Sequence, residues 1–62
     1  MKISDIVLTN TDAVYQPTQK SLSALTGSVV KINNEYDIHV LLFIDKKQSI
    51  IQFSKSELII QQ

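Results

Sequence analysis

The feature that most limits the fold of this chain is the spacing of its apolar segments. Turn-forming residues divide the 62 residues into short apolar runs, which centre near residues 7, 30, 41, 51 and 59. After Gly27 these runs follow one another too closely for a crossover connection, so neighbouring strands must run antiparallel. The spacing therefore predicts an all-β chain that ends in an antiparallel meander.

The expected strands cover residues 3–9, 27–32, 36–44, 49–53 and 58–61. A long loop, 10–26, follows the first strand, and 21–25 within it has the residues for one helical turn. A single 3₁₀ turn over 54–57 is expected to interrupt the chain before the last strand. Five short strands of this kind close best as a small barrel, because closure removes exposed sheet edges.

The order of these segments resembles that of the SH3-like small barrels. The resemblance rests on the opening Asp5-Ile6-Val7 before a long loop and on the segment Gly27-Ser28-Val29-Val30-Lys31-Ile32. It continues through the central strand 38–44 and the ending 51–58. The resemblance implies one domain over residues 1–62, a five-stranded antiparallel SH3-like barrel. It implies no particular activity, because this fold carries many unrelated functions.

The charges argue against nucleic acid as a partner. Six basic residues balance six acidic ones, and none of the basic residues is arginine. Only Lys46 and Lys47 stand together, and Asp45 precedes them. Proteins that bind nucleic acids usually carry a basic excess, because neutralising phosphates supplies much of their affinity.

Residue usage also limits cofactors and compartment. The chain has no cysteine, which fits a reducing cytoplasm, and one histidine, so we expect no metal site and no cofactor. The longest apolar run, 40–44, is far too short to span a bilayer, and no signal peptide is visible. The sequence predicts a soluble cytoplasmic protein with no membrane partner. The abundance of Ile, Lys, Asn and Gln suggests a bacterial or phage origin.

The central strand is apolar on both of its faces. Alternation places Ile38, Val40, Leu42 and Ile44 on one face and His39, Leu41 and Phe43 on the other. A small barrel has one interior, so the second face needs a cover. Either Leu22, Leu25 or Tyr15 of the long loop supplies it, or a second copy or a partner protein does. Ile50 and Ile60 are also expected to point away from the barrel interior. This excess of outward apolar side chains favours self-association or partner binding.

Other residues point to binding rather than catalysis. His39 could act as an acid or base with Asp37, two residues away, but a histidine on a strand is more often a surface or interface residue. Tyrosine is favoured at interfaces because it joins a large apolar area to a polar tip. No nucleophile motif or phosphate loop occurs, so we expect no catalytic residue. The expected binding residues are Tyr15, Tyr36, His39, Leu41, Phe43 and Ile50.

The sequence therefore predicts a non-enzymatic protein-binding module that masks or bridges a partner protein as a homo-oligomer. Two alternatives stay open: a nucleic-acid-binding protein, and an enzyme formed only at an oligomer axis. The latter comes from a likeness to the plasmid-borne type of dihydrofolate reductase, which has Val-Gln-Ile-Tyr where this chain has Ile50-Ile51-Gln52-Phe53. The glutamine is shifted by one position and the tyrosine is replaced, so no active-site role is carried over.

Overall fold

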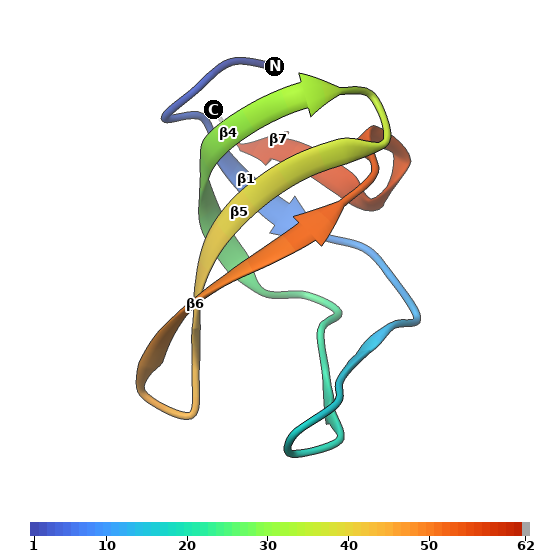
Figure 1. The fold of residues 1–62 in the computed structure, drawn as a ribbon, viewed down its shortest axis with the longest axis vertical. Coiled ribbons are helices and arrows are strands. Elements are labelled where there is room, and N and C mark those ends of the chain that lie inside the picture. The colour runs from blue at the N-terminus through green and yellow to red at the C-terminus, as the bar shows by residue number, and fades with distance from the viewer. Residues whose placement is uncertain (62) are drawn as a thin grey trace.

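The computed structural model describes residues 1–61 and is all-β (Figure 1). In that part of the chain no helix is long and apolar enough to cross a membrane. The elements, in chain order, are β1 (Ile6–Thr9), β2 (Val14–Tyr15), β3 (Lys20–Ser21), β4 (Thr26–Asn34), β5 (Asp37–Ile44), β6 (Lys47–Phe53), the 3₁₀ turn η1 (Lys55–Glu57) and β7 (Leu58–Gln61). The predicted strands and the predicted 3₁₀ turn are all present, with ends that differ by up to three residues.

Five strands form one antiparallel sheet in the order β6-β5-β4-β1-β7, and β2 and β3 form a separate two-stranded sheet. The sheet curls around the core (Figure 1), but β6 pairs only with β5, and β7 pairs only with β1, within residues 1–61. The closed barrel expected from the sequence is therefore not confirmed. The sheet is open, and it ends in two free edges.

The core lies on the concave side of this sheet. Its buried apolar residues come from five strands and from the loop after β1: Val7, Leu22, Val29, Ile38, Val40, Leu42, Ile44, Phe53 and Leu58. The period-two alternation of β5 decides which of its residues enter the core, because alternate side chains point to opposite faces. The predicted inward face of this strand is confirmed.

Gly27 allows the sheet to curl tightly. A Cβ atom at this position would lie 2.5 Å from Leu42 Cδ2 and 2.6 Å from the carbonyl oxygen of Leu41. No side chain fits there, so only glycine permits β4 to cross β5 this closely. Irregular register in β4 beside Val30 and Asn33 adds to the bend.

The connection between β5 and β6 is a tight hairpin turn. Asp45 and Lys46 both have positive φ, 53° and 66°, as a type I′ turn requires. Because the turn takes only these two residues, Ile44 pairs directly with Lys47. The sequence had placed the turn over 45–48, so β6 begins two residues earlier than predicted.

The long segment after β1 is more ordered than the sequence indicated. It contains the β2–β3 hairpin, and the helical turn expected over 21–25 is wrong, since Ser21 lies in β3 and Ala24 has a φ of 59°. The buried Thr9 is hydrogen-bonded to the end of this segment. Thr9 Oγ1 donates to the carbonyl oxygen of Leu22 at 2.5 Å and accepts from the Leu25 amide at 2.8 Å. Leu22 is thereby fixed in the core.

Candidate binding surface

The most exposed apolar side chains of the sheet lie on the convex face of β5 and β6. Phe43 is 65% exposed and Ile50 is 59% exposed, and the half-buried Leu41 lies directly across from Ile50. We call Leu41, Phe43 and Ile50 the outer-face cluster. The long loop does not cover it: Leu22, Leu25 and Tyr15 all pack against the core instead. The covering-loop alternative is therefore wrong.

The apolar surface continues across the sheet from the outer-face cluster. Strand register places Ser28 beside Leu41 on β4 and Ile6 beside Ser28 on β1. Ile6 is 45% exposed. A row of neighbouring side chains thus runs from Ile50 through Leu41 and Ser28 to Ile6, and only the small serine interrupts its apolar character.

A polar group borders the cluster at the other end of β5. His39 Nε2 lies 2.8 Å from Asp37 Oδ1, and Asn33 Nδ2 donates to Asp37 Oδ2 at 2.7 Å. The hydrogen bond from Asn33, followed by the contact with His39, lowers the pKa of the Asp37 carboxyl. The pair that the sequence suggested does form, on the same face as Leu41 and Phe43.

The strands on both sides of β5 place polar residues beside this pair. The cross-strand neighbours of His39 are Lys31 and Gln52, and neither offers an oxygen or sulfur nucleophile. Within residues 1–61, no three His, Cys, Asp or Glu side chains are grouped so that they could hold a metal ion. The roles expected for His39 and for the cluster stay predictions.

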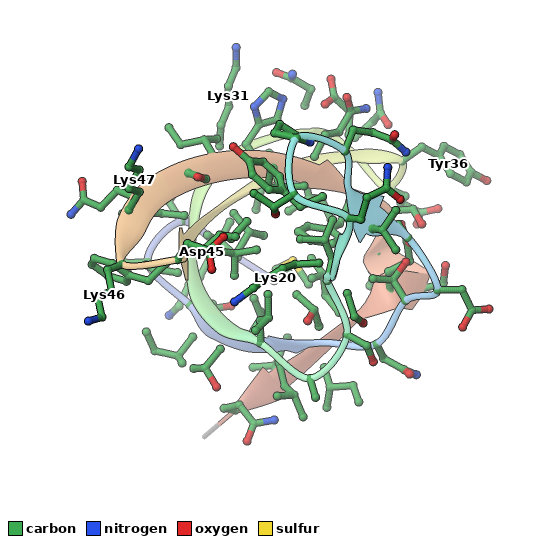
Figure 2. All side chains as sticks on the ribbon, turned by 90° about the horizontal axis from the view of Figure 1, so that it is seen from below. Lys20, Lys31, Tyr36, Asp45, Lys46 and Lys47 are labelled. Atoms are coloured by element: carbon green, nitrogen blue, oxygen red, sulfur yellow. The ribbon has the colours of Figure 1, made fainter. Side chains whose placement is uncertain are left out.

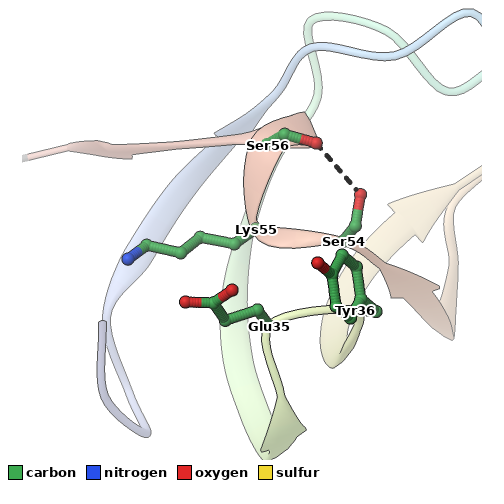
Figure 3. Close-up of a pocket in the computed structure, with 5 residues that line it drawn as sticks. All are labelled: Glu35, Tyr36, Ser54, Lys55 and Ser56. Carbon is green, nitrogen blue, oxygen red and sulfur yellow. Dashed lines mark hydrogen bonds between the residues drawn. The ribbon is translucent and has the colours of Figure 1, made fainter.

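Tyr36 lies apart from the outer-face cluster. It occupies the turn between β4 and β5 and is 76% exposed. Figure 3 shows its ring beside the segment Ser54–Ser56, where it lines an open depression with Glu35 and Lys55. The Oγ atoms of Ser54 and Ser56 lie 3.2 Å apart there. No sequence pattern indicates this depression, because it joins a turn to a 3₁₀ segment almost twenty residues later.

Tyr15 packs in part against the core, and its predicted binding role stays a prediction. It is half-buried in β2 and borders a second depression beside Pro17 and the β5–β6 turn. Close by, Lys20 Nζ lies 2.5 Å from Asp45 Oδ1, which ties the β2–β3 hairpin to the β5–β6 turn (Figure 2). The structure therefore brings together four of the six expected binding residues, His39 and the three of the cluster, and separates the two tyrosines from them.

Comparison of the chain with protein-family models, with curated proteins and with solved structures finds no match. Any function must therefore be argued from the surface itself.

Proposed function

We propose that the chain is a non-enzymatic protein-binding module with an SH3-like fold, which masks or bridges a partner protein as a homo-oligomer. The observation that carries the proposal is the exposure of Phe43 and Ile50, 65% and 59%, side by side with Leu41 on one face. Fully burying one such side chain is worth about 1.5–3 kcal/mol. A protein partner that covers the outer-face cluster would recover that free energy.

The fold assignment is supported by the order of the elements. An antiparallel five-stranded sheet, a long hairpin-bearing connection after β1 and a 3₁₀ turn before β7 are the features of an SH3-like chain. The free edges of β6 and β7 make this a half-open version of such a barrel. The assignment leaves the function to the surface, because the fold itself selects none.

The surroundings of the cluster favour a protein as the partner. An apolar centre with a polar rim is the usual anatomy of a protein interface. Here the rim consists of Gln48, Gln52, His39 and Asp37 on the same face of β5 and β6. The rim carries uncharged amides and one hydrogen-bonded His–Asp pair, which suit a partner surface with its own apolar patch.

The charge arrangement gives no support to nucleic-acid binding. Lys20 is paired with Asp45, and Lys31 lies close enough to Asp37 to help lower its pKa. Lys46 and Lys47 project from the tip of the hairpin (Figure 2), so these four lysines form no continuous stripe. Nucleic-acid binding stays an alternative, which a gel shift at physiological salt would revive.

The test is a double substitution of the most exposed residues, Phe43→Ser with Ile50→Ser. We expect the variant to lose self-association and the capture of a partner from host lysate, with an unchanged unfolding midpoint. Self-association is measured by sedimentation over a concentration series, and partner capture by cross-linking pull-down. Thermal unfolding gives the unfolding midpoint. Ile3→Ser is the matched control, since Ile3 is 52% exposed and lies outside the sheet. A double variant that unfolds, or that binds like the control, contradicts the proposal.

A further inference from the structure

The free edge of β6 lies directly beside the outer-face cluster. Strand β6 pairs with β5 over seven positions, from Lys47 to Phe53, and with no other strand among residues 1–61. The backbone hydrogen bonds outside the strand ladders in that part of the chain do not involve β6 either. Its other side therefore carries backbone amides and carbonyls without a backbone partner, which is a template for another strand.

The hairpin turn determines which residues point to this edge. In a two-residue hairpin the residues that flank the turn form a hydrogen-bonded pair. Every second pair along the ladder is then not hydrogen-bonded, and its backbone amides and carbonyls point away from the partner strand. Counting from the pair Ile44 and Lys47 gives Gln48, Ile50 and Gln52 as the outward residues. Their side chains all lie on the convex face with Phe43. Ile50 therefore belongs both to this free edge and to the outer-face cluster.

The edge also lacks the devices that normally block pairing. Between Gln48 and Gln52 there is no charged residue, no proline and no glycine, and the register of β6 with β5 is regular. Natural edge strands are usually protected by lysine, proline or a bulge. The unprotected stretch has Ile50, 59% exposed, at its centre.

We propose that a second copy of this chain pairs with this edge, β6 against β6, antiparallel and centred on Ile50. The inference rests on the proposed function and names its first partner. In this register Ile50 faces Ile50 of the second copy, and Gln48 faces Gln52 of the second copy. Ile50 is the midpoint of Lys47–Phe53, so the register pairs the whole strand. The three pairs formed by Gln48, Ile50 and Gln52 exchange two backbone hydrogen bonds each, about six in all.

The same register is self-complementary in charge. Lys47, the charged residue of β6, faces Phe53 of the second copy rather than another lysine. By two-fold symmetry this pairing occurs twice, so no like charges face each other across the two strands. A formal net charge of zero also leaves no overall repulsion between copies. A register centred one residue later would pair only residues 49–53 of the two strands, and so would form fewer hydrogen bonds.

The second free edge fits a self-contact less well. Strand β7 has four residues, and an antiparallel pairing centred on Ile59 uses only Leu58 to Ile60. This would form about half as many hydrogen bonds as the β6 contact. Pairing β6 with β7 of another copy would be a head-to-tail contact, which builds rings or filaments rather than a dimer.

The proposed dimer has a consequence for binding. A two-fold axis perpendicular to the sheet keeps both convex faces on the same side. The cluster of each copy then lies beside that of the other, in the order Leu41, Ile50, Ile50, Leu41. One continuous apolar strip results, with a Phe43 toward each end. Pairing of the two edges uses backbone groups and leaves the convex faces uncovered, so the strip stays open to a further partner.

Cysteine cross-linking tests the register directly, because the chain has no cysteine of its own. Hydrogen-bonded positions across antiparallel strands have Cα atoms about 5.5 Å apart, within disulfide reach. We expect Ile50→Cys to form a covalent dimer under mild oxidation. Gln48→Cys should cross-link only when mixed with Gln52→Cys. Ile59→Cys, on the other edge, is the control and should stay monomeric on a denaturing gel. A cross-link at Ile59 but not at Ile50 overturns the proposal.

A charge swap at the centre separates this inference from the proposed function. Ile50→Lys and Ile50→Glu should each sediment as monomers, while their equimolar mixture should recover the dimer, and Ile59→Lys should leave it intact. If the wild-type chain is monomeric, or forms larger rings, the β6 self-contact is wrong. A monomer would also remove the homo-oligomer from the proposed function, but partner binding survives in either case if Phe43→Ser still abolishes partner capture. It fails separately if Phe43→Ser changes nothing.

Discussion

The two faces of β5 both carry large apolar side chains but lie in opposite environments. Val40 and Leu42 are 0% exposed on the concave face, whereas Phe43 is 65% exposed on the convex one. Burial here follows from the curl of the sheet, which encloses one face and opens the other. The comparison teaches that a run of apolar residues specifies a strand, while sheet curvature decides which half of the run serves folding and which half is available for binding.

The sharpest way to break this comparison is to truncate neighbouring residues on opposite faces. Leu42→Ala should lower the free energy of unfolding by about 2–5 kcal/mol, because it leaves a cavity in a closely packed core. Phe43→Ala should change it by less than about 0.5 kcal/mol, as exposed substitutions usually do. Urea unfolding of both variants at low protein concentration measures the difference. Similar losses for the two would show that the convex face is part of the core.

A second comparison sets the buried threonine of β1 against an exposed one beside it. Thr9→Val keeps the shape of the side chain but leaves the Leu22 carbonyl and the Leu25 amide without their partner. We expect a loss of about 1–3 kcal/mol and faster hydrogen exchange at Leu25. Thr26→Val is the control, because Thr26 is exposed in β4 and should tolerate the change. An unchanged exchange rate at Leu25 in Thr9→Val would show that Thr9 does not hold the loop.

Much of this fold follows from sequence spacing alone. The predicted inward face of β5, the antiparallel order after Gly27 and the 3₁₀ turn before the last strand are all present. These features are local, since strand alternation and turn residues fix them over a few positions. The closure of the sheet is not local. It depends on whether β6 meets β7, which no run of neighbouring residues encodes.

The candidate surface was only partly predictable for the same reason. Leu41, Phe43 and Ile50 could be named because alternation alone puts them outside. The position of Tyr15 away from the cluster could not be predicted, because it depends on a hairpin whose strands have just two residues each. The pairing of Lys20 with Asp45 joins residues 25 positions apart, and no sequence pattern marks it. Contacts of this kind come from the tertiary fold.

The third comparison concerns two carboxylates, that of Glu57 in the 3₁₀ turn and that of Asp37 on the convex face. Glu57 caps the 3₁₀ turn: its side chain accepts from the Ser54 amide at 3.0 Å and also from the hydroxyl of Thr11, which joins the turn to the loop after β1. These hydrogen bonds, the one from the Ser54 backbone foremost, lower the pKa of Glu57. Asp37 also has a lowered pKa, but its partners Asn33 and His39 lie on the convex face.

Because the folded pKa of Glu57 lies below that of an unfolded glutamate, about 4.3, its stabilisation is complete above that pH. It is lost as the pH falls through the folded pKa, since the unfolded chain binds the proton first. Glu57→Gln should therefore cost about 1 kcal/mol at pH 7 and flatten the decline in stability below about pH 5. Urea midpoints from pH 7 to 3 measure both effects. Asp37→Asn is the comparison on the convex face. We expect it to change the loss of stability at acid pH less than Glu57→Gln does. The reverse ranking would place the more important carboxylate contact on the convex face.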